Sequence, residues 1–519
     1  MLVVRDAKAL ALKLNDPSRV LAAVPKARQL PSNPNIVVVP HRLAEAERLR
    51  EMGFSPPSPI EYQYDWPGRF KPYEHQHATA SFLTLHKRGL VLNDIGTGKT
   101  MSALWAADYL MNVGAVKKVL IMSPLSTLER VWGDAVFKEF PHRRAVTLYG
   151  DAKRRLKLLK TQADFYIINH DGFPIIAKES LDMFDLVIVD EAAVYRNPST
   201  RRFKQLFRWM TVQPNMRLWL MTGTPTPNEP TDAWTLARLV NSPYCTKTYS
   251  AFREQVMMKL GQWKFVPRPE SVDIVKHVLQ PSVRYARDDC LDLPETIIQT
   301  RKVEMTPEQS KHFKQMLKTL TTDAANDTIT AVNEAVKLQK LVQIACGVAY
   351  GEDGGSVELD CAPRVNVVKE VIEETAPNEK IIIFVPLTGT LKMLERELSK
   401  HWTVGVVNGA VTSSARNSIF YNFQHSSDPR ILIAHPATMA HGLTLTAAST
   451  VVWYGPIASN EQYVQANGRV ERIGKRKVSN VIHIEATDVE SRIYQRLQSK
   501  QKLQGVLLDL IQQMGRNPT

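Results

Sequence analysis

A glycine-rich loop between an apolar strand and a helix carries the residues best suited to chemistry. Residues 90–104 read Leu-Val-Leu-Asn-Asp-Ile-Gly-Thr-Gly-Lys-Thr-Met-Ser-Ala-Leu. Gly96 and Gly98 allow backbone N–H groups to approach phosphate oxygens, and the positive end of the following helix faces the anion. Lys99 can reach the β- and γ-phosphates, and the Thr100 hydroxyl can bind Mg²⁺. The loop therefore predicts a site for a nucleoside triphosphate and Mg²⁺.

One position of this loop departs from the strict pattern G-x-x-x-x-G-K-[ST]. Asn93 stands where that pattern has its first glycine. A Gly-Lys-Thr run alone could arise by chance at an ordinary helix start, but the preceding strand and following helix favour a phosphate loop. Whether the loop serves a kinase, a transporter or a motor depends on the rest of the chain.

An acidic pair, Asp190 and Glu191, follows the apolar run 186–189. A carboxylate at a strand end beside a phosphate loop can hold the water shell of Mg²⁺, and a neighbouring glutamate can orient or deprotonate the attacking water. Many parallel strands end in acidic residues. The pair follows the glycine loop by one or two strand–helix units, and this position favours a role in binding Mg²⁺ and activating water.

Two further segments contain residue types that could act at a triphosphate site. Residues 220–225 run from a buried strand into small hydroxyl residues, a pattern that alone could be a tight turn. Residues 465–472 contain Arg469 and Arg472, which are three apart and are expected to share one helix face. From there they could supply guanidinium groups to a γ-phosphate across a cleft. Alone, this segment would read as a basic surface helix.

Short apolar strands alternate with helical stretches, such as 101–110 and 127–137, over most of the chain. The expected strands form two series, 90–92, 119–122, 165–168, 186–189 and 218–221, then 381–385, 404–407, 431–434, 451–454 and 481–484. Such alternation favours parallel sheets covered by helices. The predicted fold is α/β, with two tandem parallel-sheet lobes.

Changes in pattern suggest four regions. Residues 1–65 form an N-terminal α+β accessory module with a strand at 36–39 and a helix at 42–52, and residues 66–242 form the first lobe, which carries the predicted triphosphate site. Residues 243–364 are expected to be a helical linker or insertion, with helices at 306–320 and 329–344. Residues 365–519 form the second lobe with a C-terminal helix.

Composition narrows the class of protein. The chain has 519 residues, 44% of them hydrophobic, and no apolar run long enough to span a membrane. Arg5, Asp6 and Lys8 stand where a signal peptide needs apolar residues, and the four cysteines lie far apart, so a reducing cytoplasm is expected. The formal net charge of +14 favours a polyanionic partner such as nucleic acid, although a generally basic protein would show the same charge.

Together, these segments resemble the Swi/Snf family of the superfamily-two helicase-like motors. The resemblance runs from about residue 70 to residue 511. The matching segments are 71–76, 93–100, 119–130, 190–193, 222–225 with Asn228, 291–295, 305–309, 381–386, 442–448 and 465–474. The resemblance implies two RecA-like lobes and an ATP site that is shared between them.

The resemblance also implies roles for particular residues. On the first lobe, Gln76 would read adenine, Gly96, Gly98, Lys99 and Thr100 would bind the phosphates, Thr100 and Asp190 would hold Mg²⁺, and Glu191 would activate water. Thr222, Gly223 and Thr224 would couple the nucleotide state to movement. Gln465, Arg469 and Arg472 would complete catalysis from the second lobe.

The function implied by the resemblance is a DNA-dependent ATPase, a helicase-like translocase that remodels DNA or displaces strands or proteins. Its partner would be duplex or forked DNA, bound largely without regard to sequence through its phosphates. The setting would be the cytoplasm of a bacterial cell or of a phage host. Its role would lie in replication, recombination or repair.

Departures from the family pattern leave alternatives open. Ala193 replaces the usual histidine of motif II, and Thr444 replaces the usual asparagine of motif V. The first change points to an alternative, an ATP-gated nucleic-acid clamp with weak motor activity. An RNA- or single-strand-dependent helicase is a second alternative, and a small-molecule kinase is a distant third. The N-terminal module is faintly similar to the accessory module of annealing helicases.

Overall fold

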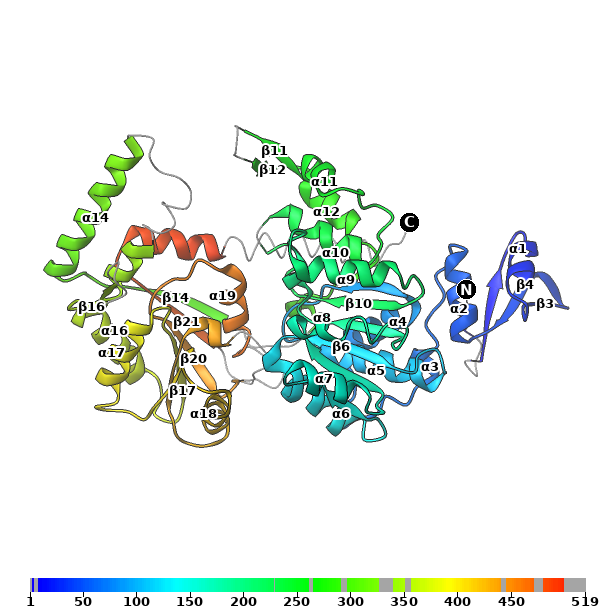
Figure 1. Cartoon of the computed structure of the whole chain (residues 1–519), viewed down its shortest axis with the longest axis horizontal. Coiled ribbons are helices and arrows are strands. Elements are labelled where there is room, and N and C mark those ends of the chain that lie inside the picture. The colour runs from blue at the N-terminus through cyan, green and yellow to red at the C-terminus, as the bar shows by residue number, and fades with distance from the viewer. Residues whose placement is uncertain are drawn as a thin grey trace. The chain divides into compact units, whose positions relative to one another are not determined.

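The structure is a computed structural model that describes residues 2–3, 8–227, 229–260, 265–290, 296–325, 339–350, 356–439, 445–470 and 479–498. The chain divides into two compact units between Cys290 and Leu291. Figure 1 shows a central sheet flanked by helices in each unit. None of the helices in these ranges has both the length and the apolar character that a membrane span needs.

The first unit is built on a seven-stranded parallel sheet of order β13-β5-β10-β9-β6-β8-β7. Its inner strands are short runs buried on both faces, which is typical of parallel strands covered by helices. The strands are β5 (Arg88–Val91), β6 (Val119–Ser123), β7 (Ala145–Thr147), β8 (Phe165–Asn169), β9 (Leu186–Val189), β10 (Arg217–Met221) and β13 (Ser282–Val283).

Alternate residues of these strands feed two separate cores, because successive side chains point to opposite faces of a sheet. One face is covered by α7 (Ala152–Leu159), α8 (Phe173–Ile176), α9 (Arg201–Thr211), α10 (Ala233–Leu239), α11 (Tyr249–Val256) and α12 (Ser271–Val278). The other face is covered by α3 (Ile60–Gln63), α4 (Glu74–Leu85), α5 (Lys99–Asn112) and α6 (Asp134–Glu139). The unit also contains α13 (Arg287–Cys290) and a hairpin of β11 (Met257–Lys259) and β12 (Phe265–Pro267).

The N-terminal residues form a small antiparallel sheet of order β1-β2-β4-β3 with two helices. Its elements are β1 (Leu2–Val3), β2 (Ala9–Lys13), α1 (Ser18–Ala23), β3 (Arg28–Leu30), β4 (Asn33–Pro40) and α2 (Leu43–Glu51). Helix α2 attaches this sheet to the larger one. Its Glu47 forms an ion pair with Arg217 at 2.5 Å, and Arg50 donates to the Leu85 carbonyl.

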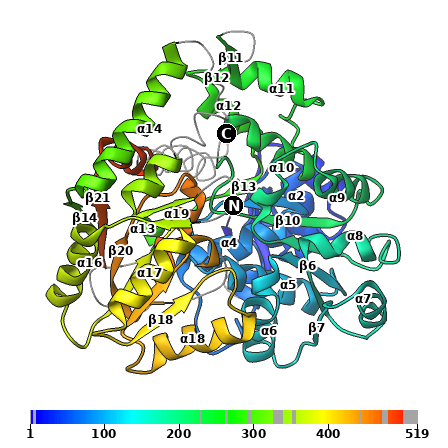
Figure 2. The same cartoon turned by 60° about the vertical axis from the view of Figure 1, so that its left-hand side comes forward.

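The second unit contains a six-stranded parallel sheet of order β14-β21-β20-β17-β19-β18. The strands are β14 (Thr296–Lys302), β17 (Lys380–Phe384), β18 (Val404–Val407), β19 (Ile431–Ala434), β20 (Ala448–Trp453) and β21 (Ser479–Glu485). One face packs on α16 (Ala362–Glu374) and α17 (Thr388–Leu398), the other on α18 (Ser413–His425) and α19 (Asn460–Asn467). Figure 2 shows α17 and α18 from a second direction.

The sheets confirm the prediction of an α/β fold with two parallel-sheet lobes. The stretch expected to be helical at 127–137 is helical, but it is not one regular α-helix. The structure has a short 3₁₀ turn η1 (Leu125–Thr127) and a wide π-helical segment η2 (Leu128–Gly133), and α6 begins only at Asp134.

The region 243–364 is more mixed than a helical linker, since it contributes β13 to the first sheet and β14 to the second. It also contains the expected helix at 306–320, found as α14 (Pro307–Ala325), and a hairpin of β15 (Val348–Tyr350) and β16 (Ser356–Glu358). Part of the helix expected at 329–344 lies outside the described residues.

Candidate functional site

Three chemically interesting segments leave the same edge of the first sheet from neighbouring strands. The order β5-β10-β9 and the registers of Met221 with Val91 and of Leu220 with Val189 place these carboxyl ends side by side. The glycine loop follows β5, residues 222–225 follow β10, and the acidic pair follows β9. The topology therefore gathers residues from three distant segments of the chain.

The glycine loop takes a conformation that requires its glycines. Gly96 and Gly98 have φ values of +90° and +80°, a region that other residues rarely adopt. A Cβ atom at Gly98 would lie 2.0 Å from Nε2 of Gln76. Helix α5 begins at Lys99 directly after this turn, so its first N–H groups face the loop. This is the geometry of an anion cradle.

The Lys99 side chain turns back over the loop. Its Nζ donates to the carbonyl oxygens of Asn93 at 2.8 Å and Asp94 at 3.0 Å. Burial lowers the pKa of the Lys99 ammonium, while the carboxylates of Glu191 and Asp190 act on its pKa in the opposite direction. The lysine of the loop and the acidic pair after β9 are thus electrostatic neighbours.

Gln76 joins the start of α4 to the glycine loop. Its Oε1 accepts the Tyr73 N–H at 3.0 Å, which caps the helix, and its Nε2 donates to the Thr97 carbonyl at 3.2 Å. Nε2 of His75 lies 2.8 Å from the same Thr97 oxygen. The segment that the resemblance assigns to adenine binding therefore also fixes the loop.

Asn93, the departure from the strict glycine pattern, has a structural role that glycine could not fill. Its Nδ2 donates to Oγ1 of Thr79 on α4 at 2.9 Å, and its Oδ1 accepts the backbone N–H of Tyr285 at 3.0 Å. The side chain is buried. It ties the end of β5 to α4 on one side and to the segment after β13 on the other.

The neighbouring Asp94 is held in the same way. It forms an ion pair with the buried Arg284 at 2.8 Å and accepts the Arg287 backbone N–H at 3.0 Å. Sequence reasoning missed both arginines, because they lie almost 200 residues from the loop and belong to no motif. The residues after β13, the edge strand next to β5, thus hold the glycine loop in place.

Both oxygens of the Asp190 carboxylate are oriented. Oδ1 accepts the Glu191 N–H at 3.0 Å, and Oδ2 accepts Nε1–H of the fully buried Trp132 at 3.0 Å. Burial raises the pKa of Asp190, and the adjacent Glu191 carboxylate raises it further. Sequence reasoning missed Trp132, whose indole stands at the end of the wide turn η2.

Glu191 has a strained backbone, with φ +49° in the left-handed region. Such a conformation is uncommon for a residue other than glycine and is concentrated at functional sites. Ala193, the residue that replaces histidine, is buried two positions later in the 3₁₀ turn η4 (Ala192–Tyr195).

The residues after β10 contact the glycine loop. A Cβ atom at Gly223 would lie 3.3 Å from Cγ1 of Ile95 and 3.4 Å from the Asn93 carbonyl oxygen. The Thr222 N–H donates to the Val91 carbonyl at 3.0 Å, and Oγ1 of Thr222 accepts the Thr224 N–H at 3.1 Å. This packing places residues 222–224 where they would respond to a change in the loop. Asn228 lies outside the described residues.

The donor set at this edge fits Mg²⁺. The Thr100 hydroxyl and the Asp190 carboxylate are oxygen donors, which Mg²⁺ prefers, and the ion usually keeps several waters and phosphate oxygens as its other ligands. In the described part of the chain no group of three or more His, Cys, Asp or Glu side chains forms a metal cluster. A magnesium ion here would therefore depend on the bound triphosphate for part of its shell.

In the second unit, Gln465 lies on α19 and Arg469 lies beyond the helix, which ends at Asn467 with Gly468 as its cap. The expectation that Arg469 and Arg472 share one helix face was therefore wrong for Arg469, because the chain turns at 468–470. Nε of Arg469 donates to the Met439 carbonyl at 3.0 Å, and its side chain is buried. Arg472 and residues 442–444 lie outside the described residues.

Gln465 is also buried and donates from Nε2 to Oε1 of Glu461 at 3.3 Å. The first unit thus brings together Gln76, Gly96, Gly98, Lys99, Thr100, Asp190, Glu191 and residues 222–224. In the second unit, Gln465 and Arg469 lie in or just after α19.

Comparison with protein families gives two adjacent matches. The SNF2-related domain matches residues 73–347, and the helicase conserved C-terminal domain matches residues 363–474. The first match spans the seven-stranded sheet and the second spans most of the six-stranded sheet.

Individual relatives are distant. Protein p41 of Acyrthosiphon pisum secondary endosymbiont phage 1 is 25% identical over 476 residues, which cover 85% of this chain and 98% of p41. ATP-dependent helicase MG018 of Mycoplasma genitalium, an uncharacterised protein, is 27% identical, with 80% of this chain and 40% of that protein covered. The ATP-dependent DNA helicase DDM1 of Arabidopsis thaliana is 24% identical, with 81% and 59% covered. The chain thus spans about half the length of the latter two.

Among solved structures, the Sulfolobus solfataricus SWI2/SNF2 ATPase core in complex with dsDNA covers 87% of this chain and 96% of its own. Its sequence identity is 21%, and the TM-score is 0.39. The SNF2-related match covers more than half of the residues of the chain and includes the glycine loop, the acidic pair and residues 222–225. The chain belongs to the SNF2-related family of helicase-like ATPases.

Proposed function

We propose that this protein is an ATP-dependent DNA translocase that acts on duplex or forked DNA. The observation that carries the proposal is that Lys99 follows β5 while Asp190 and Glu191 follow β9, two strands that flank β10 and end at the same edge of the sheet. A cationic loop residue, an oriented carboxylate and a strained glutamate suit phosphoryl transfer from a triphosphate to water.

The site residues of the first lobe would each have a part in this reaction. Lys99 would exchange the loop carbonyls for phosphate oxygens, and the N–H groups at the start of α5 would add further donors. Glu191 would orient the attacking water and accept its proton. Thr100 and Asp190 would hold Mg²⁺, which neutralises charge on the β- and γ-phosphates when it is bound.

The second lobe would contribute Arg469 and Arg472 to the charge that develops on the transferring phosphoryl group, and Gln465 would help to position them. Guanidinium groups are suited to this because they remain charged and offer several donors in a plane. Residues 222–224 would transmit the nucleotide state from the loop to the movement of the lobes.

DNA is the proposed track for two reasons. The net charge of +14 favours a polyanion. The relative DDM1, which aligns with most of this chain, is named an ATP-dependent DNA helicase. Binding through Lys and Arg contacts to phosphates would be largely independent of sequence and would weaken steeply with salt. The reducing cytoplasm of a bacterium or phage host remains the predicted location.

An ATP hydrolysis assay with a panel of nucleic acids tests the proposal. Duplex and forked DNA are expected to stimulate turnover more than single-stranded DNA or RNA, and Lys99→Ala should abolish the stimulated rate. Stimulation by RNA or single strands alone would favour the other helicase class. A Lys99→Ala variant with normal turnover would overturn the assignment of the loop.

A second function, an ATP-gated clamp with weak motor activity, rests on Ala193. The buried alanine lacks the imidazole that this family uses next to the acidic pair. Displacement of the third strand from a triplex separates the two functions, because a translocase removes that strand and a clamp does not. If the protein is a clamp, Ala193→His is expected to improve displacement while the Ala193→Ser control does not.

A further inference from the structure

A cavity of about 570 Å³ opens at the amino edge of the first sheet. We call it the α7 pocket, and its lining residues are Lys118, Leu156, Leu159, Lys160, Thr161, Gln162, Tyr166, Glu179 and Met183. Lys118 immediately precedes β6, and Gln162 shortly precedes β8. Since the glycine loop follows the carboxyl end of β5, the pocket lies on the opposite edge of the sheet from the ATP site.

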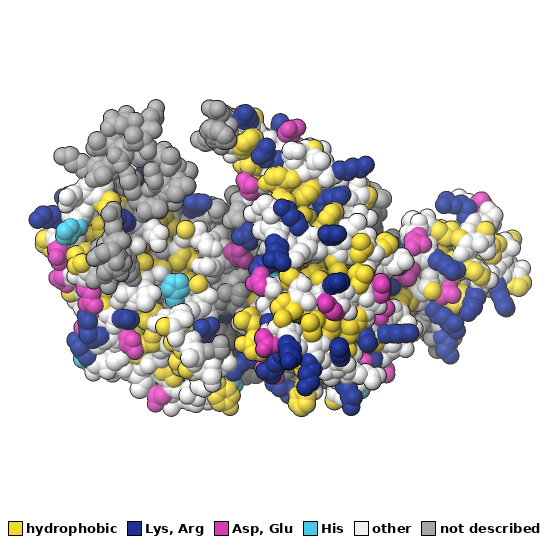
Figure 3. Space-filling model, in the orientation of Figure 1, with side chains coloured by type: hydrophobic (Ala, Val, Ile, Leu, Met, Phe, Trp, Pro, Cys, Tyr) yellow, Lys and Arg dark blue, Asp and Glu magenta, His cyan; other side chains and the backbone are white. Residues whose placement is uncertain are grey.

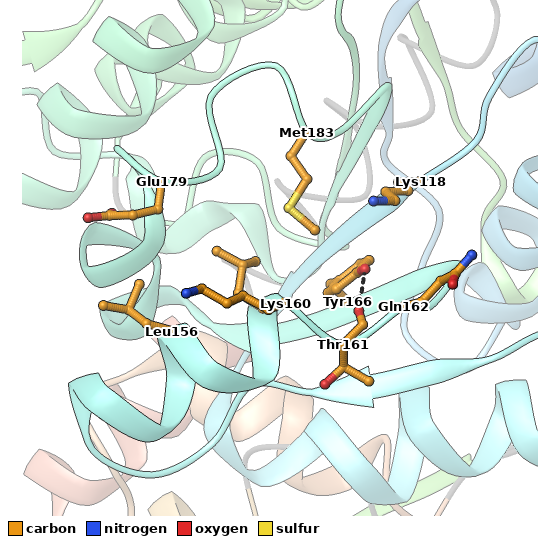
Figure 4. A pocket seen from close by; sticks show the side chains of 9 residues that line it. Lys118, Leu156, Lys160, Thr161, Gln162, Tyr166, Glu179 and Met183 are labelled. Atoms are coloured by element: carbon orange, nitrogen blue, oxygen red, sulfur yellow. Dashed lines mark hydrogen bonds between the residues drawn. The ribbon is translucent and has the colours of Figure 1, made fainter.

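The inner lining of the pocket is apolar. Leu156 and Leu159 belong to α7, Tyr166 belongs to β8, and Met183 lies in the loop before β9. Figure 4 labels Leu156, Tyr166 and Met183. The Tyr166 hydroxyl donates to the Thr161 carbonyl at 2.7 Å, so its one polar atom is already bonded within the protein. An apolar group of a ligand would therefore find a suitable surface here.

Cations stand at the rim. Lys160 and Lys118 approach the pocket from different elements, whereas the Glu179 carboxylate points away from its centre (Figure 4). The nearby Asp185 carboxylate accepts the backbone N–H groups of Lys117 at 2.8 Å and Lys118 at 3.0 Å. Asp185 is thus bonded to the backbone before β6, and among the described residues Lys160 has no ion pair with an acidic side chain.

Helix α7 extends this positive rim. Lys153 and Lys157 are exposed and lie on the same helical stripe as Lys160, beside Leu156. Arg155 faces inward instead and donates to the carbonyls of Leu148 at 2.9 Å and Gly150 at 2.8 Å. These hydrogen bonds fix the position of α7. Figure 3 shows Lys and Arg side chains gathered at the position of this helix.

We propose that the α7 pocket is a docking site for a partner protein, which binds through a short acidic peptide that carries an apolar anchor. The apolar side chain would fill the pocket, and the acidic residues would lie along Lys153, Lys157 and Lys160. The apolar lining distinguishes this surface from a nucleic-acid site, because a phosphodiester backbone has nothing to bury there. Such a site would tether the protein to a partner without blocking the carboxyl edge of the sheet, where the ATP site is proposed.

Fluorescence anisotropy of the full-length protein with a labelled peptide, Glu-Asp-Asp-Glu-Leu-Leu, tests the proposal. The wild-type protein should bind it, and Lys160→Glu should weaken binding by about tenfold, since it turns an attraction into a repulsion. The matched control Lys204→Glu changes the same charge on the exposed surface of α9 and should have no effect. Met183→Ala is expected to weaken binding by a smaller factor.

Two altered peptides separate the two parts of the site. Replacing both leucines with serine should remove the pocket contribution, and replacing the acids with their amides should remove the rim contribution. The thermal midpoint of each variant protein shows whether it is folded. Equal binding to wild-type and Lys160→Glu protein would overturn the proposal. So would loss of duplex DNA binding in Lys160→Glu with peptide binding unchanged, since the rim would then serve nucleic acid.

Discussion

The residues that form or support the proposed ATP site are held in different ways in the two lobes. At the carboxyl edge of the first sheet, segments far apart in the chain bond to one another, as Asn93 does with Tyr285 and Gln76 with Thr97. In the second lobe, Arg469 is buried and bonded to the Met439 carbonyl of its own lobe. Residues at the glycine loop are thus held by bonds between distant segments, whereas Arg469 is held by a bond within its own lobe.

The largest effect that bears on this comparison is expected from Arg469→Ala. If Arg469 stabilises the transferring phosphoryl group, ATP turnover should fall by about 10³-fold. The thermal midpoint should also fall, because the Met439 carbonyl loses its donor. Nucleotide binding to the first lobe should persist, measured with a fluorescent ATP analogue.

The exposed Arg492 provides the matched control for that experiment. Arg492→Ala removes the same charge from the second lobe and should leave turnover unchanged. If Arg469→Ala lowered only the thermal midpoint and kept normal turnover, Arg469 would have a structural role. The proposal that it takes part in catalysis would then be wrong.

A comparable loss, of about 10² to 10³-fold in turnover, is expected from Glu191→Gln. The amide keeps the size of the side chain but cannot accept the proton of the attacking water. ATP affinity should change little, since the loop and Lys99 remain. Single-turnover hydrolysis measured with radiolabelled ATP checks the chemical step, and a normal single-turnover rate would exclude Glu191 as the base.

A smaller effect is expected from Trp132→Phe, which removes the hydrogen bond to Oδ2 of Asp190. Groups that orient a metal-binding carboxylate typically contribute about 10- to 100-fold in metal affinity. The Mg²⁺ concentration required for half-maximal ATP binding should rise accordingly.

Trp105 allows a matched control, because its indole N–H donates to the Pro67 carbonyl at 2.8 Å. Trp105→Phe removes an equivalent bond away from the site and should leave the Mg²⁺ requirement unchanged. An equal shift in both variants would show that Trp132 acts through general stability rather than through Asp190.

The smallest effect is expected from Asn93→Gly, which restores the strict glycine pattern. The change removes the bonds to Thr79 and Tyr285 and should lower the free energy of unfolding by about 1–3 kcal/mol. Turnover should fall or stay the same. Urea denaturation and an ATPase assay check this, and a faster enzyme of unchanged stability would refute the structural role of Asn93.

Local sequence patterns predicted the parts of the site that follow strands. The apolar runs gave the strands to within a few residues, and parallel topology then placed the loop, Asp190 and residues 222–224 at one edge. Trp132 and Arg284 could not be predicted in this way, because their bonds to the site join residues far apart in the chain. The N-terminal sheet was only partly foreseen, since β1 and β3 have only two and three residues. Strand β2 does alternate, with Leu10 and Leu12 buried, but the prediction did not include this five-residue signal.

The central claim is that the two lobes form one DNA-stimulated motor, and its most direct test is the rate of ATP hydrolysis with and without duplex DNA. The wild-type protein should hydrolyse ATP much faster with duplex DNA, and increasing salt should reduce that stimulation. Lys99→Ala and Arg469→Ala should each abolish it. Hydrolysis that is indifferent to DNA, or that survives both substitutions, would contradict the account.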